Sequence, residues 1–393
     1  AMPVSAKYNL IKLFLCFLCL VSQVKLFYIP QDNTNKQINN FAFGSCFGGF
    51  LSEREDMFKT INKVNPDMFV WSGDVTYLDN HYTSFINHFI STDHFDNDFA
   101  EKSFNKTFNN EYYSFLRKNK PVMGVWDDHD FGINNSNKNF KHKEVVKSLF
   151  LDFMEEPENS ARRSQSKGIQ TSYTFGKGHK SFKIILLDVR YYKEVSTNPY
   201  SDMLGEEQWD WLEKELDSEE TFTFLVTGTQ FLNIKRFVTE NWYLKSRERL
   251  FDLIGKKNKS GVIFLSGDVH FAEFLRTPCI HPKLGYHIYE ITSSGLSHHS
   301  VFAQPIVDYL ANGENNIATV VTDFNFGLTE FNWGETKEDS SVKFTIYDIN
   351  QIGRLQMTVL YTEVSYNDHH KDNTQCEVDL IARFKTPLQY FNY

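Results

Sequence analysis

The sequence of 393 residues predicts an α/β fold, and three observations predict it. Six apolar runs each end in small or acidic residues. Segments with helical spacing lie between several of these runs, and apolar and polar residues alternate near the C-terminus. Strands that are apolar throughout are typical of sheets buried on both faces, as in α/β proteins.

The six apolar runs are the expected strands. They occupy residues 40–43, 67–71, 121–125, 182–187, 222–226 and 261–265. A polar cluster follows each run, such as Asp74 after the second and Asp268 after the sixth. Ligand sites in such sheets lie beyond the carboxyl ends of the strands. We therefore expect these clusters to converge, although they are far apart in the sequence.

Helices are expected at residues 52–64, 206–216 and 246–254, where apolar residues recur near helical spacing. Residues 342–349 and 355–362 alternate apolar and polar side chains, which predicts an antiparallel hairpin. With a last strand at 376–384, this hairpin is expected to form the second sheet of a sandwich within the same domain.

The composition is that of a globular protein. A mass of 46.0 kDa with 41% hydrophobic residues is enough for one large core or two smaller ones. An aromatic content of 16%, with 37 Phe, excludes a disordered chain. The net charge of −9 and the absence of a long Lys/Arg run argue against nucleic-acid binding.

The N-terminus predicts a signal peptide over residues 1–22. Lys7 precedes an apolar run at 10–21, and Lys12 lies near its start; the run is long enough for a signal core and too short for a membrane span. The alternative is an uncleaved signal anchor. Residues 23–393 are then one mature domain without a transmembrane segment, which enters the secretory pathway and is secreted, vacuolar or held at the cell surface.

Cysteines and sequons agree with that expectation. Cys16 and Cys19 leave with the signal peptide, and an odd number remains, so one of Cys46, Cys279 and Cys376 is unpaired or ligates a metal. Sequons for N-glycosylation occur at Asn105, Asn134 and Asn258.

The ends of the expected strands carry an unusual density of titratable side chains: Asp74, Tyr77, Asp79, Asp127, Asp128, His129, Asp130, Asp188, Arg190, Asp268 and His270. Gathered in one place, these carboxylates would repel one another unless cations bound them. Two metal ions about 4 Å apart are a common means of hydrolysing phosphate esters. Asp74, directly after Gly73, is the candidate carboxylate that bridges both ions.

Each of these signals has an ordinary alternative. Gly73-Asp74 suits a simple turn, His129 a satisfied loop histidine, and Cys46 an inert core thiol. Arg190 has Asp188 two residues away as a potential partner. The joint occurrence of all these residues at strand exits favours the functional interpretation.

Five segments together resemble a known family. They are Phe-Gly-Ser-Cys at 43–46, Trp-Ser-Gly-Asp-Val-Thr-Tyr at 71–77, Val-Trp-Asp-Asp-His-Asp at 125–130, Leu-Asp-Val-Arg at 187–190 and Ser-Gly-Asp-Val-His at 266–270. The series resembles that of PhoD-type alkaline phosphatases, within the calcineurin-like metallophosphoesterase superfamily. This resemblance implies a four-layer α/β/β/α sandwich.

The resemblance also implies a site that holds ferric iron and calcium. Its iron ligands correspond to Cys46, Asp74, Tyr77 and His270, and its calcium ligands to Asp74, Asp128 and Asp268. Thiolate and phenolate donate strongly to a ferric ion, and carboxylates suit calcium. The usual Asp-x-His opening of the superfamily is replaced by Gly-Ser-Cys, which argues against a plain zinc or manganese pair but leaves another divalent pair as the alternative.

The remaining roles follow from the same resemblance. His129 would act as general acid, and Arg190 would clamp phosphate oxygens. Gln230 follows the apolar run at 222–226, and its place at this strand exit predicts that it lines the substrate site. Because Cys46 is the implied iron ligand, Cys279 is expected to pair with Cys376.

The expected function is hydrolysis of phosphate monoesters, by in-line attack of metal-bound hydroxide or oxide. A phosphodiesterase or phospholipase D-like enzyme with the same metals is the alternative. A catalytically inactive secreted binding protein on this scaffold is the alternative of another class, and the intact set of site residues argues against it. The sequence does not predict the oligomeric state.

Overall fold

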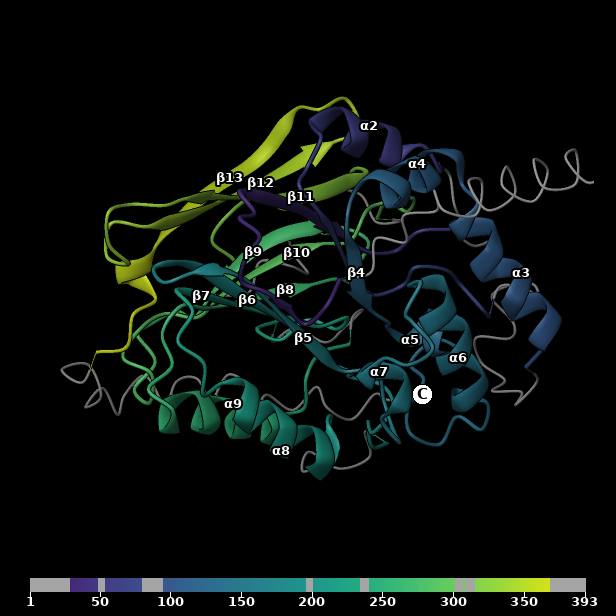
Figure 1. Ribbon diagram of the computed structural model, residues 1–393, viewed down its shortest axis with the longest axis horizontal. Coiled ribbons are helices and arrows are strands. Elements are labelled where there is room, and N and C mark those ends of the chain that lie inside the picture. The colour runs from purple at the N-terminus through teal and green to yellow at the C-terminus, as the bar shows by residue number, and fades with distance from the viewer. Residues whose placement is uncertain are drawn as a thin grey trace, which may run out of the picture.

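The computed structural model describes residues 29–48, 54–79, 95–195, 201–233, 240–300 and 315–367, together with Val307. The expected signal peptide and the expected last strand at 376–384 lie outside these residues. Two β-sheets pack against each other, and helices cover the outer face of each (Figure 1). Within the described part of the chain, no helix is long and apolar enough to cross a bilayer.

The first sheet has seven strands in the order β1-β5-β6-β7-β8-β10-β9. Their bounds are β1 Asp32–Asn33, β5 Thr171–Lys177, β6 Lys180–Leu186, β7 Phe222–Val226, β8 Val262–Ser266, β9 Ala272–Arg276 and β10 Tyr289–Ser293. Strands β6, β7, β8 and β10 are parallel to one another, whereas β5 and β9 pair antiparallel with their neighbours β6 and β10. The carboxyl ends of the four parallel strands therefore open on the same edge.

The second sheet has six strands in the order β13-β12-β11-β2-β3-β4. Their bounds are β2 Asn40–Gly44, β3 Phe69–Ser72, β4 Val122–Val125, β11 Asn325–Asn332, β12 Ser341–Asp348 and β13 Gly353–Leu360. Strands β2, β3 and β4 are parallel, and the antiparallel strands β11 to β13 continue the sheet beyond β2.

Phenylalanines fill the space between the two sheets. Phe41 of β2 meets Phe224 of β7 edge to face, with ring centroids 5.2 Å apart. Phe331 of β11 stacks on Phe182 of β6 at 4.4 Å. Such aromatic pairs add about 0.5–1.5 kcal/mol each to the burial of their surface. The high phenylalanine content of the sequence is thus used to join the two sheets.

The helices form the outer layers. Their bounds are α2 Met57–Val64, α3 Asn97–Phe108, α4 Glu111–Asn119, α5 Asp128–Phe131, α6 Lys143–Phe153, α7 Ala161–Ser164, α8 Gly205–Glu215 and α9 Leu244–Lys256. Helices α8 and α9 lie along the first sheet, and α2 and α4 lie over the second, which gives the four-layer α/β/β/α order (Figure 1). The side chain of Asn110 caps α4 by accepting from the backbone N–H groups of Tyr112 and Tyr113.

The six predicted strands, the three predicted helices and the hairpin are present, with their bounds shifted by a few residues, whereas the strand expected at 376–384 stays a prediction. One expectation needs correction. The C-terminal hairpin does not build a sheet with only C-terminal partners, because β11 pairs with β2, where Leu328 lies opposite Ala42. The six predicted strands are therefore divided, three to each sheet. This division brings the ends of β2, β3 and β4 close to the end of β8.

Candidate metal centre

Four candidate ligands lie in left-handed backbone just beyond strand ends. Cys46, Asp74, Asp268 and His270 have φ angles of 62°, 49°, 76° and 57°. Few non-glycine residues adopt positive φ, because the Cβ atom then crowds the backbone. Such strain costs about 1–3 kcal/mol per residue and clusters at functional sites. The backbone at the exits of β2, β3 and β8 is thus bent to turn these side chains toward one place.

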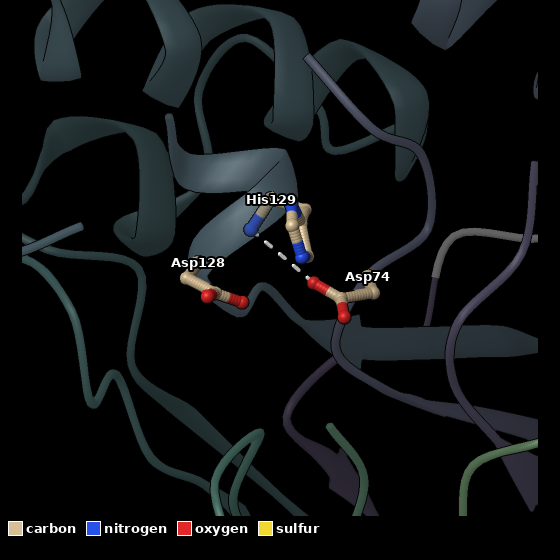
Figure 2. A group of neighbouring side chains, drawn as sticks. All are labelled: Asp74, Asp128 and His129. Atoms are coloured by element: carbon tan, nitrogen blue, oxygen red, sulfur yellow. Dashed lines mark hydrogen bonds between the residues drawn. The ribbon is translucent and has the colours of Figure 1, made fainter. Parts of the chain in front are cut away.

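Two groups of acidic and imidazole side chains meet there. The ligand atoms of Asp74, Asp128 and His129 lie within 4.8 Å of one another, and so do those of Asp127, Asp128 and Asp268. Figure 2 shows the carboxylates of Asp74 and Asp128 turned toward the same space beside the His129 ring. Asp128 belongs to both groups, so the two share a carboxylate.

Several oxygens in these groups have no hydrogen-bond partner. Asp127 Oδ2 and Asp128 Oδ1 are buried and accept no hydrogen bond. Burial, together with neighbouring acids, raises the pKa values of Asp74 and Asp268 well above the ordinary range. Buried carboxylate oxygens that accept no hydrogen bond are unfavourable, and divalent or trivalent cations with oxygen ligands relieve this cost. The carboxylate set therefore fits hard metal ions.

A second set of donors lies against Asp74. Cys46 Sγ is 3.3 Å from Asp74 Oδ2, and Tyr77 Oη is 3.0 Å from His270 Nε2. Burial raises the pKa of the Cys46 thiol to about 11, so thiolate ligation requires a metal that displaces the proton. Burial also lowers the pKa of His270 well below its usual range, which keeps the imidazole neutral, as a ligand must be.

Ser294 and His298 complete this side of the centre, and the sequence did not predict them. Ser294 Oγ lies 3.1 Å from Cys46 Sγ and accepts from the His270 backbone N–H at 3.0 Å. The His298 ring stacks on His270 with centroids 4.8 Å apart, and its Nδ1 is 3.1 Å from the Cys46 carbonyl oxygen. Both residues follow β10, so recognising that strand would have indicated them.

His129 has a dedicated partner. Its Nδ1 lies 3.0 and 2.9 Å from the two carboxylate oxygens of Asp79. Burial opposes protonation of the ring, but Asp79 and Asp128 raise the pKa of His129 well above its usual value. The contact on Nδ1 leaves Nε2 as the nitrogen available for proton transfer.

The Arg190 guanidinium is fully buried beside the carboxylates. Its Nε donates to Asp127 Oδ1 at 2.5 Å and its Nη2 to Thr229 Oγ1 at 2.9 Å, while Nη1 pairs with Glu240. The alternative partner Asp188 does not pair with the guanidinium. Its Oδ1 accepts from the Trp126 indole N–H and the Arg190 backbone N–H, and so shapes the loop after β6.

Comparison with known protein families shows to which family this chain belongs. The family described as PhoD-like phosphatase matches residues 41–337, about three quarters of the chain. The chain belongs to the PhoD-like phosphatase family. All of the candidate ligands and Arg190 lie inside the matched residues.

The comparison also finds similar proteins of known sequence or structure. Alkaline phosphatase D of Bacillus subtilis (strain 168) is 26% identical over 183 residues, which cover 38% of this chain and 31% of that protein. The solved structure of PhoD superposes with a TM-score of 0.61 at 16% identity, over 91% of this chain and 79% of that one. GAP50, the anchor in the inner membrane complex of Plasmodium, superposes with a TM-score of 0.47 at 11% identity, over 89% and 96% of the two chains.

Gln230 is engaged away from the carboxylates of this PhoD-like centre. Its amide Nε2 donates to Glu273 Oε1 at 2.7 Å and to Thr292 Oγ1 at 3.0 Å, and its Oε1 accepts from Asn233. These contacts occupy the Gln230 side chain inside the first sheet. Its predicted contact with substrate stays a prediction.

The predictions about modification remain open in this PhoD-like chain. Cys46 is a free, buried thiol and Cys279 is disulfide-bonded. Cys376 lies outside the described residues, so the pairing with Cys279 stays a prediction. Asn105 and Asn258 are exposed, as glycan acceptors must be.

Proposed function

We propose that this chain is a metal-dependent phosphoesterase that hydrolyses phosphate monoesters. The observation that carries the proposal is that Asp128, whose buried Oδ1 accepts no hydrogen bond, joins Asp74 and His129 on one side to Asp127 and Asp268 on the other. Membership in the PhoD-like phosphatase family supports a phosphate ester as the substrate. A phosphate ester is negatively charged, and metal ions held by these carboxylates would neutralise that charge.

The proposed cofactors are ferric iron and calcium. Iron would be held by Cys46, Tyr77, His270 and Asp74, because thiolate, phenolate and imidazole donors lie together there. Asp128 and Asp268, with Asp74, would hold calcium through oxygens alone. When bound, these ions would neutralise phosphate oxygens and lower the pKa of a water molecule.

His129 is the proposed general acid. Asp79 holds Nδ1, so the proton for a leaving alkoxide would reside on Nε2. A charged imidazolium beside acidic neighbours is the protonation state that a general acid needs before the reaction.

The secretory pathway is the proposed location. The disulfide at Cys279 supports an oxidising compartment, and exposed Asn105 and Asn258 suit glycosylation. Expression of the full chain in eukaryotic cells should give a product that starts near residue 23 and shifts in mass on removal of N-glycans. An unshifted product that retains residues 1–22 would contradict this location.

The experiment that tests the activity compares two substrates. Purified protein is expected to cleave para-nitrophenyl phosphate faster than bis(para-nitrophenyl) phosphate, and chelator or Asp128→Asn should abolish both activities. Glu206→Gln is the control, because Glu206 pairs with Arg249 on the surface. Faster cleavage of the bis ester would replace the monoesterase with a phosphodiesterase. Full activity in Asp128→Asn would contradict the site.

A further inference from the structure

The Arg190 guanidinium has no N–H group facing solvent. Its Nε–H is taken by Asp127, and Nη2 lies 2.9 Å from Thr229 Oγ1. Nη1 pairs with the Glu240 carboxylate and lies 3.4 Å from the Ser136 carbonyl oxygen. The side chain is 0% exposed. A substrate oxygen therefore reaches Arg190 only if one of these partners gives way.

Glu240 is the partner that faces solvent. One of its carboxylate oxygens pairs with Arg190 and the other with the Lys193 ammonium group. The side chains of Arg190 and Lys193 are 0% and 3% exposed, whereas that of Glu240 is 22% exposed. Asp127 and Asp128, the other acidic neighbours of Arg190, are 0% and 1% exposed. Glu240 thus separates two buried cations from the solvent.

These cations lie beside the candidate metal centre. Arg190 Nη2 is 3.8 Å from Asp128 Oδ1, and Asp128 belongs to both groups of candidate ligands. A phosphate ester held at that centre would present its free oxygens within reach of the cations. Carboxylate and phosphate both accept paired hydrogen bonds from a guanidinium, so one can replace the other.

Hydrogen bonds hold the two residues that follow Glu240, so a movement of its side chain is enough to release the cations. Trp242 N–H donates to the Gln230 carbonyl oxygen at 3.1 Å, and the Asn241 side chain donates to the Asn233 carbonyl oxygen at 2.8 Å. Gln230 therefore acts on this region through its backbone, as support for the segment that carries Glu240.

We propose that Arg190 and Lys193 form an anion subsite, and that the Glu240 carboxylate occupies the place of a substrate phosphate group until the substrate displaces it. This inference rests on the proposed phosphoesterase function and adds a determinant of substrate class. A monoester dianion competes better with a carboxylate for two cations than the single charge of a diester does. Glu240 is thereby a specificity-determining residue that favours monoesters and lowers affinity for both ester classes.

Binding of inorganic phosphate to the metal-loaded full chain, measured by calorimetry, tests the subsite. Glu240→Gln is expected to bind phosphate on the order of tenfold more tightly than wild type, because a charged competitor is removed. Lys193→Met in the Glu240→Gln background should abolish the gain. Glu213→Gln is the matched control, because Glu213 pairs with Lys256 on the exposed surface. Glu240→Ala is a second variant with the same expected direction.

Unchanged or weaker phosphate binding in both Glu240 variants, with their folded near-ultraviolet spectra intact, would overturn the proposal and leave Glu240 as a structural partner of Arg190. Hydrolysis of para-nitrophenyl phosphate is measured on the same wild-type sample. Wild type that hydrolyses the ester while the Glu240 variants bind phosphate no more tightly refutes the subsite alone. Wild type without hydrolysis refutes the proposed function, and phosphate binding still decides the subsite.

Discussion

Replacement of Asp79 by asparagine tests the proposed role of His129. Both Asp79 oxygens lie within 3.0 Å of His129 Nδ1, and the two side chains are 20% and 18% exposed, so solvent screens the pair only in part. A hydrogen bond between charged groups contributes about 1.5–3 kcal/mol, which corresponds to roughly 10- to 150-fold in rate. We expect Asp79→Asn to lose that much activity on alkyl phosphates, whose leaving groups need a proton.

The assay compares leaving groups. Activity on para-nitrophenyl phosphate should fall far less, because its phenolate leaves without protonation. Metal content should be unchanged, and Asp98→Asn on the exposed first turn of α3 should match wild type on both substrates. Equal losses on the alkyl and para-nitrophenyl esters would refute the reasoning, because they would separate Asp79 from proton donation.

Three further perturbations test other parts of the account. Asp74→Asn should lower metal content and reduce activity by about 100-fold or more, because losing even a residue that only orients a metal ligand lowers metal affinity or activity by about 10- to 100-fold. Elemental analysis alongside the activity assay checks this, and wild-type metal content in the variant would contradict it. Gly228→Ala would place a Cβ atom 2.3 Å from Asp127 Cγ and should destabilise the protein by about 1–3 kcal/mol in denaturant unfolding. Gly353→Ala, whose closest contact is the Thr345 methyl group at 3.3 Å, should change the stability by much less. Burial raises the pKa of Glu273 from 4.5 to about 8, so the folded state keeps a proton that the unfolded chain releases between those values. Stability should therefore fall as pH rises from 4.5 to 8, by up to roughly 5 kcal/mol, and Glu273→Gln should flatten that fall; an unchanged pH profile would contradict it.

The strand ends could be predicted because their signals are local. A continuous apolar run followed by Gly73 and Asp74 marks a buried strand and its exit within a few residues of sequence. The same holds for β8 and Asp268. Local patterns also sufficed for the helices α2, α8 and α9, whose apolar residues recur at helical spacing.

Strands β5 and β10 could not be predicted, because polar residues interrupt their apolar pattern. Glu290 is fully buried within β10 and accepts from the backbone N–H groups of Phe231 and Leu232. The role of Glu290 as an acceptor for these N–H groups can be recognised only once β7 and β10 are placed in the same sheet. Because β10 was not predicted, no local pattern indicated that Ser294 and His298, which follow it, lie at the site.

The partners of the site residues depend on contacts between distant segments. Glu240 is 50 residues from Arg190 in sequence, and nothing in the local pattern of either residue indicates their pairing. Asp188, two residues from Arg190, was the partner that proximity suggested, whereas Asp127 fills that position from the end of β4. The sequence thus indicates which residues reach the site, whereas tertiary packing decides which side chains pair with one another there.

Anomalous diffraction from crystals of the purified full chain at the iron absorption edge tests the central claim most directly. We expect a peak within coordination distance of Cys46 Sγ, Asp74 and His270 Nε2, and loss of that peak in Cys46→Ser crystals grown under the same conditions. A metal-replete crystal with no peak beside these residues, or with iron bound elsewhere, would contradict the assignment of the metal centre.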